Sequence, residues 1–159
     1  MVIEPMTLDV ARVIQQWTYE EPYSLYSFGE EENVISEFMN GSYYYVMDKK
    51  EKLIGYFCFG KSAQVPAGYQ VNAYEDHLLD IGLGMAPEET GKGKGKIFLQ
   101  EGIDFGTKKY NMIGCRLTVA AFNKRAKKVY EREGFVYQQM FVNATDSSAI
   151  SFEVMVRKK

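Results

Sequence analysis

The chain has 159 residues, of which 46% are hydrophobic and 25% are charged. This length suits one domain, because a second hydrophobic core would leave too few residues for either core. The composition excludes a disordered chain, and a net charge of -2 gives no overall basic field to attract nucleic acid. We therefore expect a single domain over residues 1–159 that binds no nucleic acid.

The N-terminal sequence MVIEPMTLDVARVIQQW has no basic segment followed by an apolar one, as a signal peptide would have. No stretch approaches the ~20 apolar residues that a membrane span needs. Cys58 and Cys115 each lie in an apolar run, where a free cysteine packs as a small hydrophobic residue. We therefore expect a cytoplasmic protein without a membrane segment.

Two short helices and a hairpin are predicted in the first part of the chain. Thr7 can cap a helix that continues to Trp17 with apolar residues on one face. A second helix is predicted from Glu31 to Met39, because the helix-ending pair Asn40-Gly41 follows it. The aromatic and β-branched runs Ser42 to Asp48 and Leu53 to Phe59 indicate two antiparallel strands.

The remaining chain alternates between strands and helices after a long loop. The segment Gly60 to His77 shows neither the helical nor the strand periodicity over most of its length, so it is predicted to be a loop. A loop of this length often borders a site. The predicted elements after it are the strand Leu78–Met85, the helix Ile97–Tyr110, the strand Met112–Val119, the helix Lys124–Glu133 and the strands Val136–Val142 and Ser151–Arg157. This order predicts a mixed α/β fold with helices on both faces of a twisted sheet.

A glycine-rich loop, Thr90-Gly91-Lys92-Gly93-Lys94-Gly95-Lys96, joins a predicted strand to a predicted helix. Glycines let the backbone approach a ligand closely, and the first turn of a helix offers unpaired N–H groups that bind phosphate. Neither the P-loop pattern nor the dinucleotide-binding pattern fits these letters. A flexible turn and a triphosphate cradle are the alternatives to a pyrophosphate site.

This loop resembles the glycine signature of the GNAT superfamily of N-acetyltransferases, R/Q-x-x-G-x-G/A, with Thr90 in place of arginine or glutamine. The main pyrophosphate contacts of the family are backbone amides, which threonine also provides. A second family pattern, N-x-x-A-x-x-x-Y/F-x-x-x-G-F, corresponds to Asn123, Ala126, Tyr130, Gly134 and Phe135. The two patterns stand in the expected order of elements, and the resemblance extends from about Thr7 to Arg157.

The resemblance implies a mostly antiparallel sheet of about six to seven strands, with a splay between the fourth and fifth strands. It implies acetyl-CoA as co-substrate, with the pantetheine arm against the backbone of the fourth strand and the pyrophosphate on the amides of the glycine loop. The implied cofactor-binding residues are Leu83, Gly84, Met85, Gly91, Lys92, Gly93, Lys94, Gly95, Lys96, Asn123 and Tyr130.

The resemblance makes Tyr130 the candidate general acid, because a phenol can protonate the departing thiolate. Some relatives carry a glutamate as general base on the fifth strand, where this chain has Thr118. Asp80 is the best substitute, acting through water, although a structural hydrogen-bonded carboxylate is the alternative. Glu75, Asp76 and His77 are further candidates for the base, and no metal is expected.

We therefore expect an N-acetyltransferase that transfers acetyl from acetyl-CoA to a primary amine by direct attack. A module that binds acetyl-CoA or CoA without transferring anything is the alternative, and the missing fifth-strand acid favours it slightly. The segment between the first two helices carries acidic and aromatic residues that suit a cationic amine: Tyr19, Glu20, Glu21, Tyr23 and Tyr26. The final strands could support a homodimer.

Overall fold

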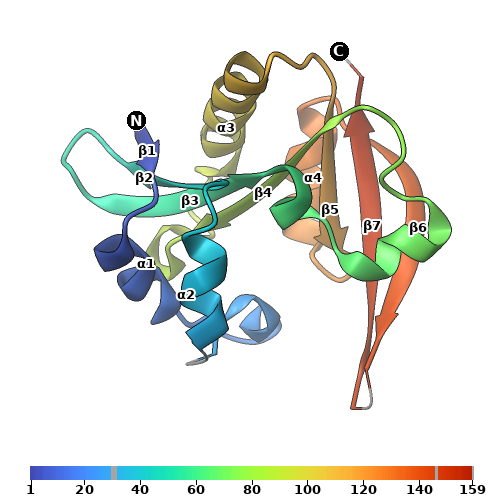
Figure 1. Ribbon diagram of the computed structural model, residues 1–159, viewed down its shortest axis with the longest axis horizontal. Helices are drawn as coiled ribbons and strands as arrows, with labels where there is room; N and C mark the ends of the chain where they lie inside the picture. Colours follow the sequence, from blue (N-terminus) through green and yellow to red (C-terminus); the bar gives the residue numbers. More distant parts are fainter. Residues whose placement is uncertain (30–31, 146, 159) are drawn as a thin grey trace. The chain divides into compact units, whose positions relative to one another are not determined.

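Seven strands follow one another in the sheet order β1-β2-β3-β4-β5-β7-β6 (Figure 1). The computed structural model describes residues 1–29, 32–145 and 147–158. They belong to two compact units that interleave in the sequence, the first with residues 1–58 and 83–94, and the second with residues 59–82 and 95–159. Strands β3 (Leu53–Phe59) and β4 (Leu79–Met85) contribute residues to both units. The single domain expected from the length stays a prediction.

The first unit packs two helices against antiparallel strands. Its elements are β1 (Val2–Pro5), α1 (Leu8–Gln15), the 3-10 helix η1 (Ser24–Tyr26), α2 (Glu32–Phe38), β2 (Tyr43–Met47), β3 up to Cys58, the end of β4 and the 3-10 helix η4 (Pro87–Glu89). The Thr7 hydroxyl accepts a hydrogen bond from the amide of Val10 at 3.3 Å, so α1 is capped as predicted. Phe38 forms edge-to-face pairs with Phe28 and Tyr43, both at 5.1 Å between ring centroids.

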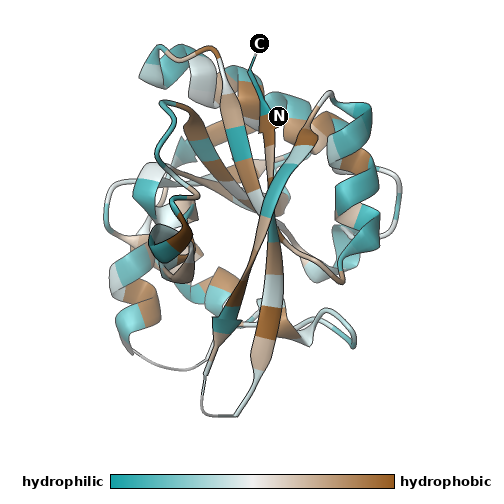
Figure 2. Ribbon diagram, turned by 90° about the vertical axis from the view of Figure 1, so that its right-hand side faces the viewer, coloured by the Kyte–Doolittle hydropathy of each residue, from teal (hydrophilic) through white to brown (hydrophobic). Residues whose placement is uncertain are grey.

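The second unit carries most of the remaining sheet. Its elements are the 3-10 helices η2 (Gly60–Ala63) and η3 (Pro66–Val71), the start of β4, α3 (Gly95–Tyr110), β5 (Cys115–Ala120), α4 (Lys124–Arg132), β6 (Val136–Ala144) and β7 (Ala149–Arg157). Strand β7 pairs antiparallel with both β5 and β6. Hydrophobic and hydrophilic residues alternate along the strands in Figure 2, as strands with two unlike faces require.

Strands β4 and β5 form the parallel pair of the sheet. Leu79 is opposite Cys115 and Asp80 is opposite Arg116. The register holds for these two positions only, although both strands continue, as the predicted splay requires. The mixed α/β class and the mostly antiparallel sheet are therefore confirmed.

The two faces of this pair are covered by different segments. A side chain at Gly106 of α3 would lie 2.4 Å from the Phe59 ring and 2.9 Å from Leu79, so glycine lets α3 approach the strands closely. Because neighbouring residues of a strand point to opposite faces, Asp80 and Arg116 face away from α3. That face is covered by the segment 60–77, which was predicted as a loop and contains η2 and η3.

One strand was not predicted, and another begins later than predicted. Strand β1 was not expected, because four largely exposed residues ending in Pro5 show no alternating pattern. The strand predicted from Met112 begins at Cys115 instead, since the Met112 amide still bonds the Thr107 carbonyl at 3.0 Å and completes the end of α3. The predicted start of the second helix, Glu31, lies outside the described residues.

Candidate active site

The glycine loop turns sharply before helix α3. Gly91 and Gly93 have φ values of 72° and 75°, which glycine adopts without strain. A side chain at Gly93 would meet nothing within 4 Å, so its backbone angle, rather than crowding, explains this glycine. The loop thus has the backbone freedom that the predicted phosphate site needs.

Thr90 stands where the family signature has arginine or glutamine. Its hydroxyl donates to the Pro87 carbonyl at 2.8 Å, so this side chain holds the η4 turn that precedes the loop. The substitution is therefore compatible with a formed turn.

A buried carboxylate lies beside the glycine loop, and the sequence did not single it out. Glu89 is 3% exposed, and its two oxygens accept from Lys94 Nζ at 3.2 and 3.1 Å. Lys92 Nζ lies 3.8 Å from the same carboxylate. The hydrogen bond from Lys94 lowers the pKa of Glu89 below its usual value. Two of the three loop lysines are therefore paired.

The end of strand β4 presents backbone groups at two edges. The Ala86 amide donates to Ile54 of β3 at 2.8 Å. Since backbone groups of successive strand residues point to opposite edges, those of Leu83 and Met85 face away from β3. A side chain at Gly84 would lie 2.3 Å from the Tyr56 ring, so glycine is needed where β4 passes this tyrosine.

Tyr19, which the sequence assigned to an acceptor wall, reaches the same edge of β4. Its hydroxyl donates to the Met85 carbonyl at 2.6 Å, and its amide donates to the Ser27 hydroxyl at 2.9 Å. Burial, with a smaller contribution from Glu88, raises the pKa of Tyr19 to about 12. The phenol is therefore a stable hydrogen-bond donor at neutral pH.

Asn123 and Tyr130 belong to helix α4 and its cap. The Asn123 side-chain oxygen accepts from the Ala126 amide at 3.1 Å, so this residue is the N-cap of α4. Tyr130 is 9% exposed, and its ring lies 6.3 Å from that of Phe135. The second family pattern thus describes a capped helix with a mostly buried tyrosine on its inner side.

Asp80, the predicted general base, is buried in an ion pair. Its Oδ1 accepts from Arg116 Nε at 2.7 Å, and its Oδ2 accepts from Arg116 Nη2 at 2.7 Å and from Gln64 Nε2 at 2.8 Å. Both partners of the pair are almost fully buried, at 3% and 2% exposure. A carboxylate offers about four acceptor positions, and three of them are taken. This geometry favours the structural alternative for Asp80.

Thr118, at the position of the missing fifth-strand acid, forms a hydrogen bond with Tyr74. Their hydroxyl oxygens lie 2.9 Å apart, and the Tyr74 hydroxyl also accepts from the Val65 amide at 3.0 Å. The Arg116 guanidinium lies 5.1 Å from the centroid of the Tyr74 ring. Burial raises the pKa of Tyr74. The fifth-strand position is therefore occupied by a neutral hydroxyl pair.

Sequence reasoning missed this network, although one signal was available. Arg116 interrupts the apolar run MIGCRLTV, and a charge inside a buried strand needs a partner. That partner is Asp80, and Gln64 and Tyr74 extend the network into the segment that covers this face.

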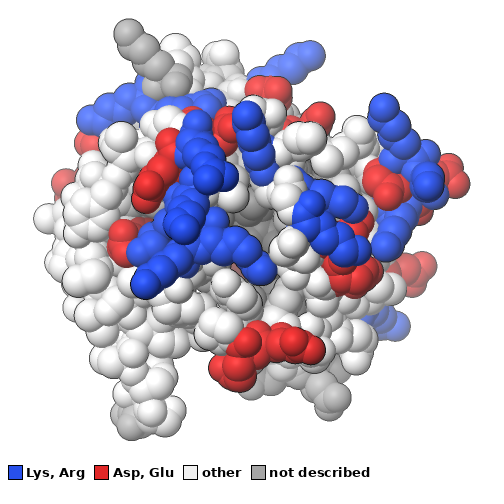
Figure 3. Space-filling model, turned by 180° about the vertical axis from the view of Figure 1, so that it is seen from behind, with Lys and Arg blue, Asp and Glu red and all other residues white. Residues whose placement is uncertain are grey.

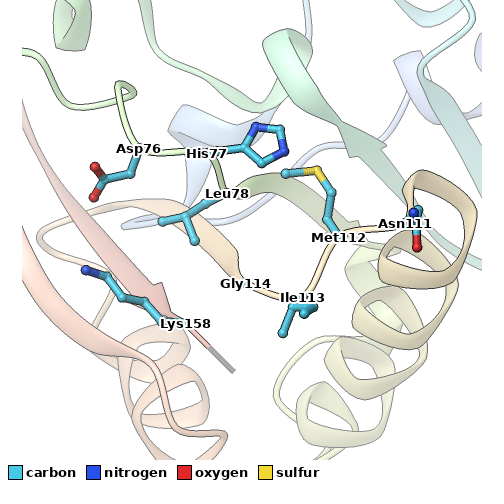
Figure 4. A pocket seen from close by; sticks show the side chains of 8 residues that line it. All are labelled: Asp76, His77, Leu78, Asn111, Met112, Ile113, Gly114 and Lys158. Carbon is cyan, nitrogen blue, oxygen red and sulfur yellow. The ribbon is translucent and has the colours of Figure 1, made fainter.

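A cavity of about 530 Å³ opens at another part of the second unit (Figure 4). It is lined by Asp76, His77, Leu78, Asn111, Met112, Ile113, Gly114 and Lys158. Seven of them lie just before β4 and β5, and Lys158 follows the end of β7, whereas Asn123 and Tyr130 come after the end of β5. The cavity therefore contains two of the further candidates for the base and none of the predicted cofactor-binding residues.

Charged side chains of both signs are mixed on the face shown in Figure 3. Lys92 and Lys94 pair with Glu89, and Lys127 pairs with Glu153 at 2.8 Å. In the described parts of the chain, no helix is both long and apolar enough to cross a membrane. The same residues contain no group of three or more His, Cys, Asp or Glu side chains that could hold a metal ion.

The sequence profile of the Acetyltransferase (GNAT) family matches residues 9–135. The chain belongs to the GNAT acetyltransferase family. This match includes both the glycine loop and the α4 pattern, so the family resemblance seen in the sequence is confirmed. No curated protein sequence matches the chain closely.

Solved structures of GNAT acetyltransferases share this fold. An acetyltransferase of the GNAT family from Bacillus anthracis superposes with a TM-score of 0.72 at 16% identity, covering 98% of this chain and 93% of that one. A chimera of the spermidine N-acetyltransferase SpeG from Vibrio cholerae and hSSAT gives a TM-score of 0.70 at 20% identity, with 98% and 94% covered. A mutant form of the spermidine/spermine N-acetyltransferase SpeG from Vibrio cholerae gives a TM-score of 0.66 at 20% identity, covering 98% of this chain and 93% of that one. At these identities the likeness establishes the fold.

Proposed function

We propose that this GNAT acetyltransferase moves the acetyl group of acetyl-CoA onto a primary amine by direct attack. The observation that carries the proposal is the glycine loop, in which two positive-φ glycines lead directly into helix α3. A helix N-terminus behind such a loop is suited to pyrophosphate. The capped helix α4 with its mostly buried Tyr130 supplies the second family pattern.

The proposed cofactor site uses backbone groups of the loop and of β4. The amides from Gly91 to Lys96 would hold the pyrophosphate, and Asn123 would contact the cofactor near the start of α4. The groups of Leu83 and Met85 that face away from β3 would pair with the pantetheine arm, because that edge carries the strand's outward donors and acceptors. Bound acetyl-CoA supplies an acetyl group activated as a thioester.

The proposed chemistry needs one proton donor and one proton acceptor. The amine nitrogen attacks the thioester carbonyl, so a C–N bond forms and the C–S bond breaks. Tyr130 gives its phenolic proton to the departing thiolate. The amine's own proton goes to water, since the Asp80 oxygens are already engaged by Arg116 and Gln64.

We propose a small cationic amine as the acceptor. Glu20 and Glu21 are exposed between α1 and α2, and the rings of Tyr23 and Tyr26 are half-buried in the same segment. Carboxylates and aromatic faces both attract ammonium groups. Two of the solved structures with the same fold are forms of spermidine N-acetyltransferases, which agrees with an acceptor of this chemistry.

The alternative is a CoA-binding module that transfers nothing. One observation favours it, because the fifth-strand position of the usual acid carries Thr118, hydrogen-bonded to Tyr74. The mostly buried Tyr130 and the complete α4 pattern favour the enzyme.

Mass spectrometry of candidate acceptors separates the two functions. The purified protein is incubated with acetyl-CoA and, in turn, spermidine, a simple monoamine and a peptide with a free N-terminus. The proposal predicts one added acetyl group on spermidine and less on the monoamine. Acetylation of the peptide alone would contradict the cationic acceptor, and no acetylation with demonstrated CoA binding would favour the binding module.

We also propose that the protein works in the cytoplasm and forms a homodimer. Cys58 and Cys115 are both buried and form no disulfide, which suits a reducing compartment. Strand β6 ends the sheet order, has no charged residue between Val136 and Ala144, and exposes half or more of Tyr137. An uncharged edge strand of this length can pair with a second copy.

A further inference from the structure

Glu89 is an unexpected residue for a loop that binds an anion. Its carboxylate is 3% exposed, and a buried charge is unfavourable unless it is paired. It also carries the same sign as the pyrophosphate that the neighbouring loop is proposed to bind, so its field opposes that ligand. A residue with two such disadvantages needs a compensating role.

The contacts of Glu89 join the two ends of the glycine loop. Glu89 closes the η4 turn, because its amide donates to the Ala86 carbonyl at 2.8 Å. Its side chain accepts from Lys94 at 3.1 and 3.2 Å. Between these anchors lie Gly91 and Gly93, the two residues with positive φ. The contact between Glu89 and Lys94 therefore bridges the part of the loop that contains both positive-φ glycines.

We propose that Glu89 is a positioning residue that holds the glycine loop in its anion-binding shape by tying Lys94 and Lys92 to the η4 turn. Glycine has more conformations to lose than any other residue, so a loop with two free glycines would bind an anion only in a fraction of its conformations. A tie across those glycines raises that fraction. The inference rests on the proposed function.

The same contacts assign a role to two of the loop lysines, Lys92 and Lys94. The side chains of Lys92 and Lys94 are 55% and 52% exposed and direct their ammonium groups to Glu89. The single carboxylate therefore balances one of these two positive charges, and Lys94, at 3.1 Å, is its nearer partner. In this proposal Lys92 and Lys94 shape the loop, and the backbone amides contact the pyrophosphate.

The test compares Glu89→Gln with Glu88→Gln. Both variants remove one negative charge beside the loop, but Glu88 is exposed and Glu89 is buried. CoA binding is measured by isothermal titration, and kcat/KM is measured with acetyl-CoA and with S-acetylpantetheine, which lacks the pyrophosphate. If the untied loop holds its binding shape about one tenth of the time, the Kd for CoA rises about tenfold in Glu89→Gln.

We expect this rise in Glu89→Gln only, with kcat/KM for S-acetylpantetheine unchanged in both variants. A Kd for CoA in Glu89→Gln that equals or falls below that of Glu88→Gln would overturn the proposal, because the carboxylate would then only oppose the anion. If Glu89→Gln lowered kcat/KM as much with S-acetylpantetheine as with acetyl-CoA, the proposal would also be overturned. If the unaltered protein does not bind CoA, the proposed function fails instead.

A second variant keeps the proposal testable if Glu89→Gln does not fold. Lys94→Gln breaks the same tie from the half-exposed side. The tie predicts that Lys94→Gln alone raises the Kd for CoA about tenfold. It also predicts that the double variant with Glu89→Gln, where it folds, has a Kd for CoA no higher than that of either single variant. An unchanged Kd in Lys94→Gln, or additive losses in the double variant, would show independent roles and overturn the inference.

Discussion

The ion pair between Asp80 and Arg116 decides whether Asp80 is a base or a structural group. Asp80→Asn keeps the size of the side chain and removes its charge, which leaves a buried guanidinium without its counter-ion. Arg116→Met removes the cation and leaves a buried carboxylate with Gln64 as its remaining side-chain donor. Each single change therefore exposes one charge to an environment that cannot solvate it.

The magnitude follows from the burial of both groups. Their N–O contacts are 2.7 Å, and both residues are 3% exposed or less. Removing one partner of such a pair lowers the free energy of unfolding by about 3–5 kcal/mol. For a chain of this size that is a fall in Tm of roughly 6–20 °C. The double variant Asp80→Asn with Arg116→Met should be less destabilised than the sum of the single variants.

Thermal unfolding and acetyl transfer, measured on the same preparations, test this reasoning. Asp104→Asn is the matched control, since Asp104 is exposed on helix α3 and should change stability by less than about 0.5 kcal/mol. We expect Asp80→Asn to lower Tm strongly and to keep kcat at a temperature where it stays folded. An unchanged Tm together with a loss of kcat of about 10²-fold or more would refute the structural role and restore Asp80 as the general base.

Three further changes test the remaining assignments. Tyr130→Phe should lower kcat by about 10²-fold or more while leaving the Kd for CoA nearly unchanged, and unchanged turnover would remove Tyr130 from its role. Tyr19→Phe should lower the free energy of unfolding by about 1 kcal/mol without weakening acetyl-CoA binding, because it frees the Met85 carbonyl. Since the pKa of Tyr19 is raised from 10.0 to about 12, the hydrogen bond from its phenol to the Met85 carbonyl contributes fully below pH 10 and is lost as the pH rises through 12. A tyrosinate absorbance titration compared with Tyr19→Phe measures this pKa. A value near 10 would contradict the prediction. Gly84→Ala should destabilise the protein by about 1–3 kcal/mol, because its methyl group would overlap the Tyr56 ring; an unchanged urea midpoint would show that the ring can move aside.

Local signals in the sequence were enough to predict most of the elements. The Thr7 cap, the helix-ending Asn40-Gly41 and the aromatic runs on either side of the hairpin act over a few residues, and each appears in the structure. Strand β1 escaped prediction because its pairing with β2 depends on residues 39 to 45 positions away. Similarly, the Met112 amide belongs to the end of α3 through a bond that its apolar neighbours do not reveal.

The candidate site was predictable where a pattern fixes the backbone and unpredictable where distant side chains meet. Glycine spacing indicated the turn before α3, which positive φ values at Gly91 and Gly93 bear out. The partners of Asp80 could not be read from spacing, since Arg116 lies 36 positions away. The pairing of Glu89 with Lys94 is local, but the burial that makes it unusual appears only in the fold.

We propose that the glycine loop and helix α4 bind acetyl-CoA for transfer to an amine. Isothermal titration with acetyl-CoA, followed by measurement of thiol release with and without spermidine, tests it most directly. The account predicts saturable binding and thiol release that depends on the amine. Absence of acetyl-CoA binding, or binding displaced by ATP as readily as by CoA, would contradict it.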